Sequence, residues 1–179
     1  KFKQHVEKAM RMMDDIIDLE LEKVELIINK IAADPEDEDI RRVELELWKK
    51  IRTMARKGRR TGLGITAEGD MLAALGLRYG TPEATAFAVK VQKTLALEAY
   101  RASVKMAAER GAFEIFDARK EEKNPMIGRI READPELYAE MVKHGRRNIA
   151  MLTIAPTGTT SLMSQTTSGI EPVFRPVYK

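Results

Sequence analysis

The sequence has no cysteine and only two histidines, and these absences exclude several kinds of chemistry within the chain. Without cysteine there can be no disulfide scaffold, thiolate zinc site, iron–sulfur ligation or thiol catalysis. His5 and His144 lie far apart in the sequence, so a histidine-rich metal centre is excluded as well. We therefore expect no metal site here and no catalytic set of nucleophile, base and acid.

Long apolar runs and a strong excess of one charge are also missing. No run approaches the roughly 20 apolar residues that a membrane span needs, and no apolar signal segment opens the sequence. The 31 Lys and Arg residues oppose 28 Asp and Glu residues, and the net charge of +3 is too small to indicate nucleic-acid binding by itself. These features favour a cytoplasmic protein without a membrane or nucleic-acid partner.

The length of 179 residues suits a single domain or a piece of a larger one. The sequence begins at Lys1 without an initiator methionine and ends in an extended run at Val177, Tyr178 and Lys179. We therefore expect an excerpt of a longer polypeptide. Its fold class is predicted to be α/β and predominantly helical.

Residues 1–58 are predicted to form an antiparallel helical hairpin. Apolar residues recur at intervals of three and four from Phe2 to Ile31, which is typical of one face of a long amphipathic helix. Asp34 is expected to cap the second helix, with Pro35 at its first position. The apolar stripe of that second helix consists of Ile40, Val43, Leu47, Ile51 and Met54.

Residues 59–147 are predicted to be a mainly helical segment. A short extended stretch at 61–66 precedes a short helix that stops at Gly76. Thr81, Pro82 and Glu83 are typical of a helix start, and that helix should end at Gly111. Residues 119–128 are expected to form a charged, solvated loop, followed by a helix that begins near Asp134.

Residues 148–179 are predicted to contain a strand, a turn, a helix and a second strand. The stretch from Ile149 to Ile154 is apolar except for Thr153, which is typical of a buried strand. Residues 173–178 are expected to form the second extended run. Between them lies a turn rich in small and hydroxyl-bearing residues: Pro156, Thr157, Gly158, Thr159, Thr160 and Ser161.

This turn is the place where the sequence indicates binding chemistry. A strand that passes through a turn into a helix start exposes several free backbone N–H groups, and the helix dipole adds positive charge there. Gly158 would let a ligand oxygen approach the backbone, and the neighbouring hydroxyls could donate further hydrogen bonds. A phosphate needs such a site. The pattern alone equally allows an ordinary capped junction without a ligand.

Two other features favour a structural interpretation. Gly62 and Gly64, followed by Glu68 and Asp70, are more typical of closely packed backbone than of a second site. The basic clusters at 59–60 and 143–147 coincide with expected helix ends, which indicates solvated charge rather than phosphate binding. Carboxylates are expected on the solvated faces of helices.

Six sequence blocks, taken in order, match one known family: 13–18, 59–72, 100–103, 109–113, 154–161 and 168–174. Together they resemble the large catalytic subunit of ribonucleotide reductases. The resemblance covers nearly the whole chain. Gly158 stands where aerobic class I enzymes tend to carry alanine, which favours the adenosylcobalamin-dependent class II.

The resemblance implies that residues 1–179 are part of the ten-stranded α/β barrel of these enzymes. The intact enzyme would reduce a ribonucleotide substrate by a thiyl-radical mechanism, with adenosylcobalamin as cofactor. It also implies that Pro156, Thr157, Gly158, Thr159 and Thr160 bind the substrate phosphates, with Ser161 as a possible addition.

The resemblance equally implies what this segment lacks. The catalytic cysteines would lie in the remainder of the reductase chain, so we expect no catalytic residue, no cobalamin binding and no turnover here. The intact enzyme could be a homodimer. Two alternatives remain open: a helical protein-interaction module, and a non-catalytic module that binds phosphate or nucleotide.

Overall fold

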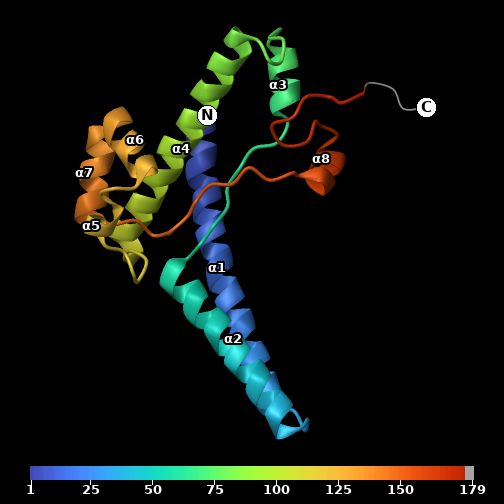
Figure 1. Cartoon of the computed structure of the whole chain (residues 1–179), viewed down its shortest axis with the longest axis vertical. Helices are drawn as coiled ribbons and strands as arrows, with labels where there is room; N and C mark the ends of the chain where they lie inside the picture. Colours follow the sequence, from blue (N-terminus) through green and yellow to red (C-terminus); the bar gives the residue numbers. More distant parts are fainter. Residues whose placement is uncertain (176–179) are drawn as a thin grey trace. The chain divides into compact units, whose positions relative to one another are not determined.

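The computed structural model describes residues 1–175, and these fold into helices joined by extended segments (Figure 1). The chain divides into two compact units. Unit 1 comprises residues 1–62 and 97–151, and unit 2 comprises residues 63–96 and the chain from Leu152 on. The helices are α1 (Phe2–Ala32), α2 (Glu38–Gly58), α3 (Glu68–Ala74), α4 (Pro82–Arg110), α5 (Ala118–Glu121), α6 (Pro125–Ala133), α7 (Pro135–His144) and α8 (Gly158–Ser164).

The predicted hairpin is present in unit 1, where α1 and α2 pack against each other (Figure 1). The start of α2 differs from the prediction. Asp37, not Asp34, is the N-cap, and its side chain accepts a hydrogen bond from the Asp39 N–H at 2.9 Å. Asp34 instead accepts from the Glu36 N–H within the connecting turn, because an Asp side chain bonds the backbone two residues on as readily in a turn as at a cap.

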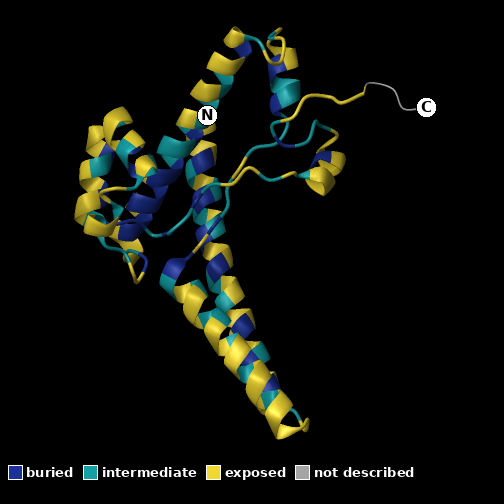
Figure 2. Cartoon of the chain, in the orientation of Figure 1, coloured by how far each residue is buried: buried dark blue, intermediate teal, exposed yellow. Residues whose placement is uncertain are grey.

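The two apolar faces of α2 have different surroundings. The side packed on α1 carries the half-buried Leu45, Trp48 and Ala55. The stripe expected from the sequence points away from that contact, and most of it is exposed: Ile40 54%, Val43 58%, Leu47 54% and Met54 66%, with Ile51 half-buried. Figure 2 shows how much of the hairpin is exposed. We call these five residues the outer stripe.

The middle of the chain largely follows the prediction. Thr81 Oγ1 accepts from the Ala84 N–H at 3.3 Å at the start of α4, and Gly111 follows its end with a φ of +87°. The expected solvated loop at 119–128 is wrong, because α5 and the start of α6 occupy it. Asn124 caps α6 by accepting from the Met126 N–H, and Pro125 takes the first helical position.

The strand predicted at 149–154 is absent from the structure. Residues 60–66 and 150–156 lie outside the helices, and Leu63 and Leu152 form an isolated parallel bridge between them, but the described residues contain no strand. A ladder needs several consecutive pairs and further neighbouring strands, which residues 1–175 do not supply. The predominantly helical character predicted for the chain is thus confirmed for residues 1–175, whereas the α/β part of the prediction is corrected there, because these residues contain no strand. Part of the second expected run, 176–178, lies outside the described residues.

The division into segments 1–58, 59–147 and 148–179 stays a prediction, because each compact unit combines separated parts of the sequence. No helix within residues 1–175 combines the length and the apolar character needed to cross a bilayer.

Candidate functional site

The predicted phosphate turn lies in unit 2, where the chain passes from an extended segment into α8. Thr157 is the N-cap of this helix and adopts a left-handed conformation, with φ 53° and ψ 26°. The Ser161 N–H donates to the Thr157 carbonyl at 2.8 Å and so closes the first helical turn. The N–H groups of Gly158, Thr159 and Thr160 precede that bond and have no partner within the helix.

The inner side of the turn is held by hydroxyl groups. Thr157 Oγ1 accepts from the Gly169 N–H at 2.6 Å and lies 3.0 Å from Thr66 Oγ1. Ser161 is buried, donates to the Gly158 carbonyl at 2.8 Å and lies 2.7 Å from Ser168 Oγ. The sequence suggested these two hydroxyls as ligand donors, but they form hydrogen bonds that hold the turn on its inner side.

The outer side of the turn is open. A Cβ built on Gly158 would meet no atom within 4 Å. Pro156, Thr159 and Thr160 are exposed beside it. The structure thus brings the six predicted residues into one turn and separates them into two groups. Thr157 and Ser161 face inward, whereas Gly158, Thr159 and Thr160 are accessible.

Residues 167–169 connect this turn to the start of α3. The Glu68 N–H donates to the Gly169 carbonyl at 3.2 Å. The Asp70 N–H donates to Thr167 Oγ1, and the Thr167 N–H donates to Asp70 Oδ2 at 2.8 Å. The loop after α8 therefore satisfies the N–H groups of Glu68 and Asp70 at the start of α3 and, through Gly169, holds Thr157 in place.

Gly64 has the structural role that the sequence favoured. A Cβ at this position would lie 2.5 Å from the Thr153 carbonyl oxygen. The Thr153 N–H donates to the Leu63 carbonyl at 3.0 Å, so the two extended backbones run in direct contact. Only glycine fits such an approach.

A buried polar cluster in unit 1 was not predicted. Asp14 is 0% exposed on the face of α1 that should be apolar. Its carboxylate accepts from Arg59 Nε at 2.8 Å, Asn148 Nδ2 at 2.9 Å and Arg147 Nε at 3.2 Å. Asn148 also donates to the Arg59 carbonyl and accepts from Ser103 Oγ. The cluster joins α1 to the ends of α2 and α7 and to the C-terminal half of α4.

Charge pairing decides the ionisation of this cluster. Burial alone raises the pKa of Asp14, but the hydrogen bonds and charges of Arg59 and Arg147 outweigh it and hold the pKa below its ordinary value of 3.8. Burial likewise disfavours the charged form of Arg59, but hydrogen bonds to Asp14 and Asp18 leave its pKa raised. Both groups are therefore ionised at neutral pH.

The expectation that the basic clusters are solvated is wrong for one arginine in each cluster. Arg59 is 5% exposed and Arg146 is 2% exposed. The Arg146 guanidinium lies 5.4–5.9 Å from the ring centroids of Tyr100, Phe113 and Phe116, and its Nη2 donates to Glu121 at 2.7 Å. These arginines hold unit 1 together.

One signal in the sequence could have identified Asp14. It lies between Met10 and Ile17 at intervals of four and three, so it belongs to the stripe that continues through Val24, Ile28 and Ile31. A carboxylate on such a stripe must find cationic partners when the stripe is buried. Nothing comparable in the sequence separates Arg146 from a surface arginine.

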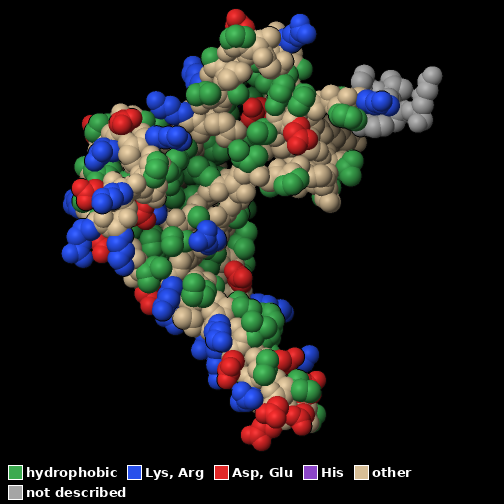
Figure 3. Space-filling model, viewed as in Figure 1, with side chains coloured by type: hydrophobic (Ala, Val, Ile, Leu, Met, Phe, Trp, Pro, Cys, Tyr) green, Lys and Arg blue, Asp and Glu red, His purple; other side chains and the backbone are tan. Residues whose placement is uncertain are grey.

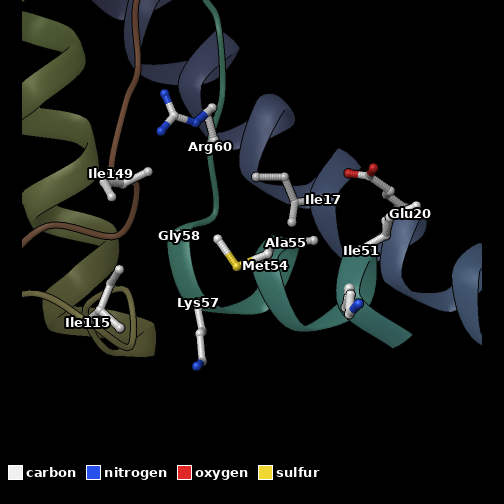
Figure 4. A pocket seen from close by; sticks show the side chains of 11 residues that line it. Ile17, Glu20, Ile51, Met54, Ala55, Lys57, Gly58, Arg60, Ile115 and Ile149 are labelled. Carbon is white, nitrogen blue, oxygen red and sulfur yellow. The ribbon is translucent and has the colours of Figure 1, made fainter. Parts of the chain in front are cut away.

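A cavity of about 500 Å³ lies in unit 1 beside the end of α2 (Figure 4). Ile17, Ile51 and Met54 are among the residues that line it, and Lys50 and Lys57 contribute positive charge. The cavity is mainly apolar. Its lining residues include none of the hydroxyl side chains found at the turn before α8.

Comparisons with known proteins indicate one family. Residues 1–179 match the family described as "Ribonucleotide reductase, barrel domain". The chain is 37% identical over 121 residues to a protein of Mycobacterium tuberculosis named vitamin B12-dependent ribonucleoside-diphosphate reductase, covering 67% of this chain and 14% of that protein.

Two further relatives carry related names. A vitamin B12-dependent ribonucleoside-diphosphate reductase of Thermoplasma acidophilum is 31% identical over 174 residues, covering 97% of this chain and 17% of that protein. A ribonucleoside-diphosphate reductase subunit alpha of Treponema pallidum is 31% identical over 126 residues, covering 65% of this chain and 14% of that protein. The chain thus spans about a seventh of the length of these curated relatives.

Proposed function

The chain belongs to the ribonucleotide reductase family through its barrel domain, and on this premise we propose that it supplies the substrate-phosphate turn of a vitamin B12-dependent reductase. The names of two relatives support the cofactor class. The substrate of the intact enzyme is a ribonucleotide, and the reaction replaces its 2′-hydroxyl with hydrogen.

The open outer side of the turn at Gly158 carries this proposal. Because nothing lies within 4 Å of a Cβ at Gly158, phosphate oxygens can reach the N–H groups of Gly158, Thr159 and Thr160. The exposed hydroxyls of Thr159 and Thr160 add donors. Thr157 and Ser161 fix the backbone from inside, so that the amides are oriented before the ligand arrives.

The turn contributes binding and orientation rather than bond breaking. Two parts of this reaction need thiols: the thiyl radical forms on a cysteine, and a cysteine pair becomes oxidised as the 2′-hydroxyl leaves as water. This sequence has no cysteine. We assign those steps to the remainder of the intact reductase. The segment alone is therefore expected to bind phosphate without turnover.

The residues described here do not fit the cobalamin cofactor. His5 is exposed on α1, and His144 Nε2 lies 3.3 Å from Glu140 on α7. The cavity beside α2 is lined mainly by apolar side chains with a few charged ones, and no histidine lines it that could bind cobalt. No step through the cofactor follows from these residues, and its binding groups belong to other parts of the enzyme.

Titration of a nucleoside diphosphate against the 179-residue chain tests the proposal. The Gly158→Val variant places a branched side chain over the free amides and should weaken binding by about tenfold or more. Gly128→Val on α6 is the matched control, since Gly128 is another helical glycine with no atom within 4 Å of its Cβ position. Equal affinity of the Gly158→Val variant and the parent chain would remove the phosphate role.

The phosphate itself should account for this binding. Inorganic pyrophosphate is therefore expected to compete with the nucleotide, whereas the corresponding nucleoside is not. The same substitution in the intact reductase should raise KM for the substrate more than it lowers kcat, because the turn lies at the phosphates rather than at the reacting carbon.

A further inference from the structure

The outer stripe of α2 is an apolar surface that the described residues leave largely uncovered. Four of its members, Ile40, Val43, Leu47 and Met54, are each more than half exposed. They recur at helical spacing on one face, while α1 occupies another face of the same helix. A continuous row of exposed apolar side chains on a helix indicates a contact surface.

The spacing of the stripe is symmetric about Leu47. Val43 and Ile51 each lie four residues from Leu47, and Ile40 and Met54 each lie seven residues from it. A second copy of α2 laid antiparallel on the first, with Leu47 against Leu47, would therefore place Ile40 on Met54 and Val43 on Ile51. An isologous contact about a two-fold axis requires this self-matching order.

The charges beside the stripe have the matching order. With 100° between successive residues, Asp39, Glu46, Lys50 and Lys57 follow the same edge of the stripe. The acidic pair lies toward the start of α2 and the basic pair toward its end. When a second copy of α2 runs antiparallel to the first, its Lys50 lies opposite Glu46 and its Lys57 lies opposite Asp39. Each pair is offset by about 3 Å along the helix axis.

The side chains at this edge are available for such pairing. Asp39 and Glu46 contact Arg42 at 3.1 and 3.8 Å in exposed positions, where ion pairs contribute little and exchange easily. Lys50 and Lys57 form no ion pair within residues 1–175. Figure 3 shows acidic side chains gathered at the tip of the hairpin and basic ones farther along it.

We propose that the outer stripe is a self-association surface, on which α2 of a second copy of this chain packs antiparallel about a two-fold axis through Leu47. The proposal is independent of the phosphate turn. From Ile40 to Met54 the helix is about 21 Å long, so the contact is smaller than a standard stable interface and the dimer is expected to be weak.

The cavity beside α2 adds to this surface. Ile51, Met54, Lys50 and Lys57 line it, and they form the end of α2 that the start of the second copy's α2 would reach (Figure 4). Ile40 of that copy would meet the apolar side chain of Met54. The acidic residues before Ile40 would face the positive charge of Lys57.

Sedimentation equilibrium of the 179-residue chain, over about two orders of magnitude in concentration, tests the association. We expect a reversible dimer. Leu47→Lys places two lysines on the axis and should weaken association by about tenfold or more. Leu26→Lys is the matched control, because Leu26 is 62% exposed on α1 and lies outside the stripe. Circular dichroism verifies that both variants keep their helices.

Charge reversal tests the pairing at the edge. Lys50→Glu with Lys57→Glu should weaken the dimer, and the further changes Asp39→Lys and Glu46→Lys should restore it. If the fourfold variant associates again, the weakening in the double variant was not caused by a loss of folding. Failure of the added changes to restore association would contradict the antiparallel order.

Cysteine cross-linking tests the geometry, because the chain has no cysteine of its own. With a short bismaleimide, Leu47→Cys should cross-link to itself. Ile40→Cys should cross-link to Met54→Cys in a mixture of the two variants, and neither of these should cross-link alone. Self-cross-linking of Ile40→Cys would instead indicate a parallel contact and overturn the proposal. A chain that stays monomeric throughout would overturn it too.

Discussion

Asp14 Oδ1 accepts a hydrogen bond of 2.8 Å from Arg59 Nε, although 45 positions separate the two residues in the sequence. The Asp14 side chain is fully buried and that of Arg59 is nearly so. Arg59 directly follows α2 and has a left-handed backbone with a φ of 44°. The pair therefore fixes the end of α2 against the middle of α1, and the direction in which the chain leaves the hairpin depends on it.

Asp14→Asn should destabilise the chain strongly. The substitution removes the charge that compensates Arg59 and Arg147, and breaking a buried pair in this way typically costs about 3–5 kcal/mol. Asp15→Asn is the matched control, since Asp15 pairs with Arg110 in an exposed position and its loss should cost about 1 kcal/mol or less. Urea unfolding followed by circular dichroism measures both, and equal effects would contradict this role of Asp14.

Acid should weaken the same cluster. Because the pKa of folded Asp14 lies below its ordinary value of 3.8, the unfolded chain binds the proton more readily. The stabilising contribution of Asp14 is therefore fully present above about pH 4 and is lost as pH falls through the folded pKa. The free energy of unfolding should fall with pH in this range, and the fall should be shallower in Asp14→Asn. Parallel curves for the two proteins would exclude Asp14 as a source of acid sensitivity.

Local signals predicted most of the helices and few of the contacts between them. Periodicity placed α1 and α2, and Thr81 with Pro82 marked the start of α4, because these signals act within one turn of helix. The orientation of α2 could not be predicted from its most apolar stripe. Leu45 and Trp48 form a second apolar face, and contact with α1 selected that face.

Long-range pairing was harder to predict. Ile149 to Ile154 has a strand-like sequence, yet a strand also depends on partners that this segment does not contain. The turn before α8 could be located from its residue types. The inward direction of the Thr157 and Ser161 hydroxyls could not, because it depends on Gly169 and Ser168, which lie beyond α8.

Gly64→Ala should destabilise unit 2 despite the small size of the added group. The methyl carbon would lie 2.5 Å from the Thr153 carbonyl oxygen, so the two backbones must separate. Gly128→Ala is the control. Gly128 lies inside α6 with free space around it, and alanine there should stabilise the chain by about 0.5–1 kcal/mol. Thermal unfolding of the two variants should therefore shift in opposite directions.

Arg146→Lys should not be conservative. The flat guanidinium packs among Tyr100, Phe113 and Phe116 while Nη2 donates to Glu121, and an ammonium group offers neither the planar stacking nor the same donors. We expect a loss of about 1–3 kcal/mol in the free energy of unfolding. Arg119→Lys, at an arginine whose side chain is 90% exposed, should leave stability nearly unchanged. A similar small effect at both positions would show that the three rings do not require arginine.

Thr157 should control the rigidity of the phosphate turn through a single hydroxyl. Its left-handed backbone, with φ 53°, is unfavourable for a β-branched residue, so the conformation must be held by other contacts. The bond from the Gly169 N–H to Thr157 Oγ1, at 2.6 Å, supplies one such contact.

Thr157→Ser keeps this oxygen and should preserve slow hydrogen exchange at the Gly169 amide. Thr157→Val removes the oxygen, retains the branched shape and should accelerate that exchange by about tenfold or more. Because the Gly158 amide remains exposed in both variants, weaker nucleotide binding by Thr157→Val alone would show that orientation of the turn, and not only its accessibility, contributes to the site.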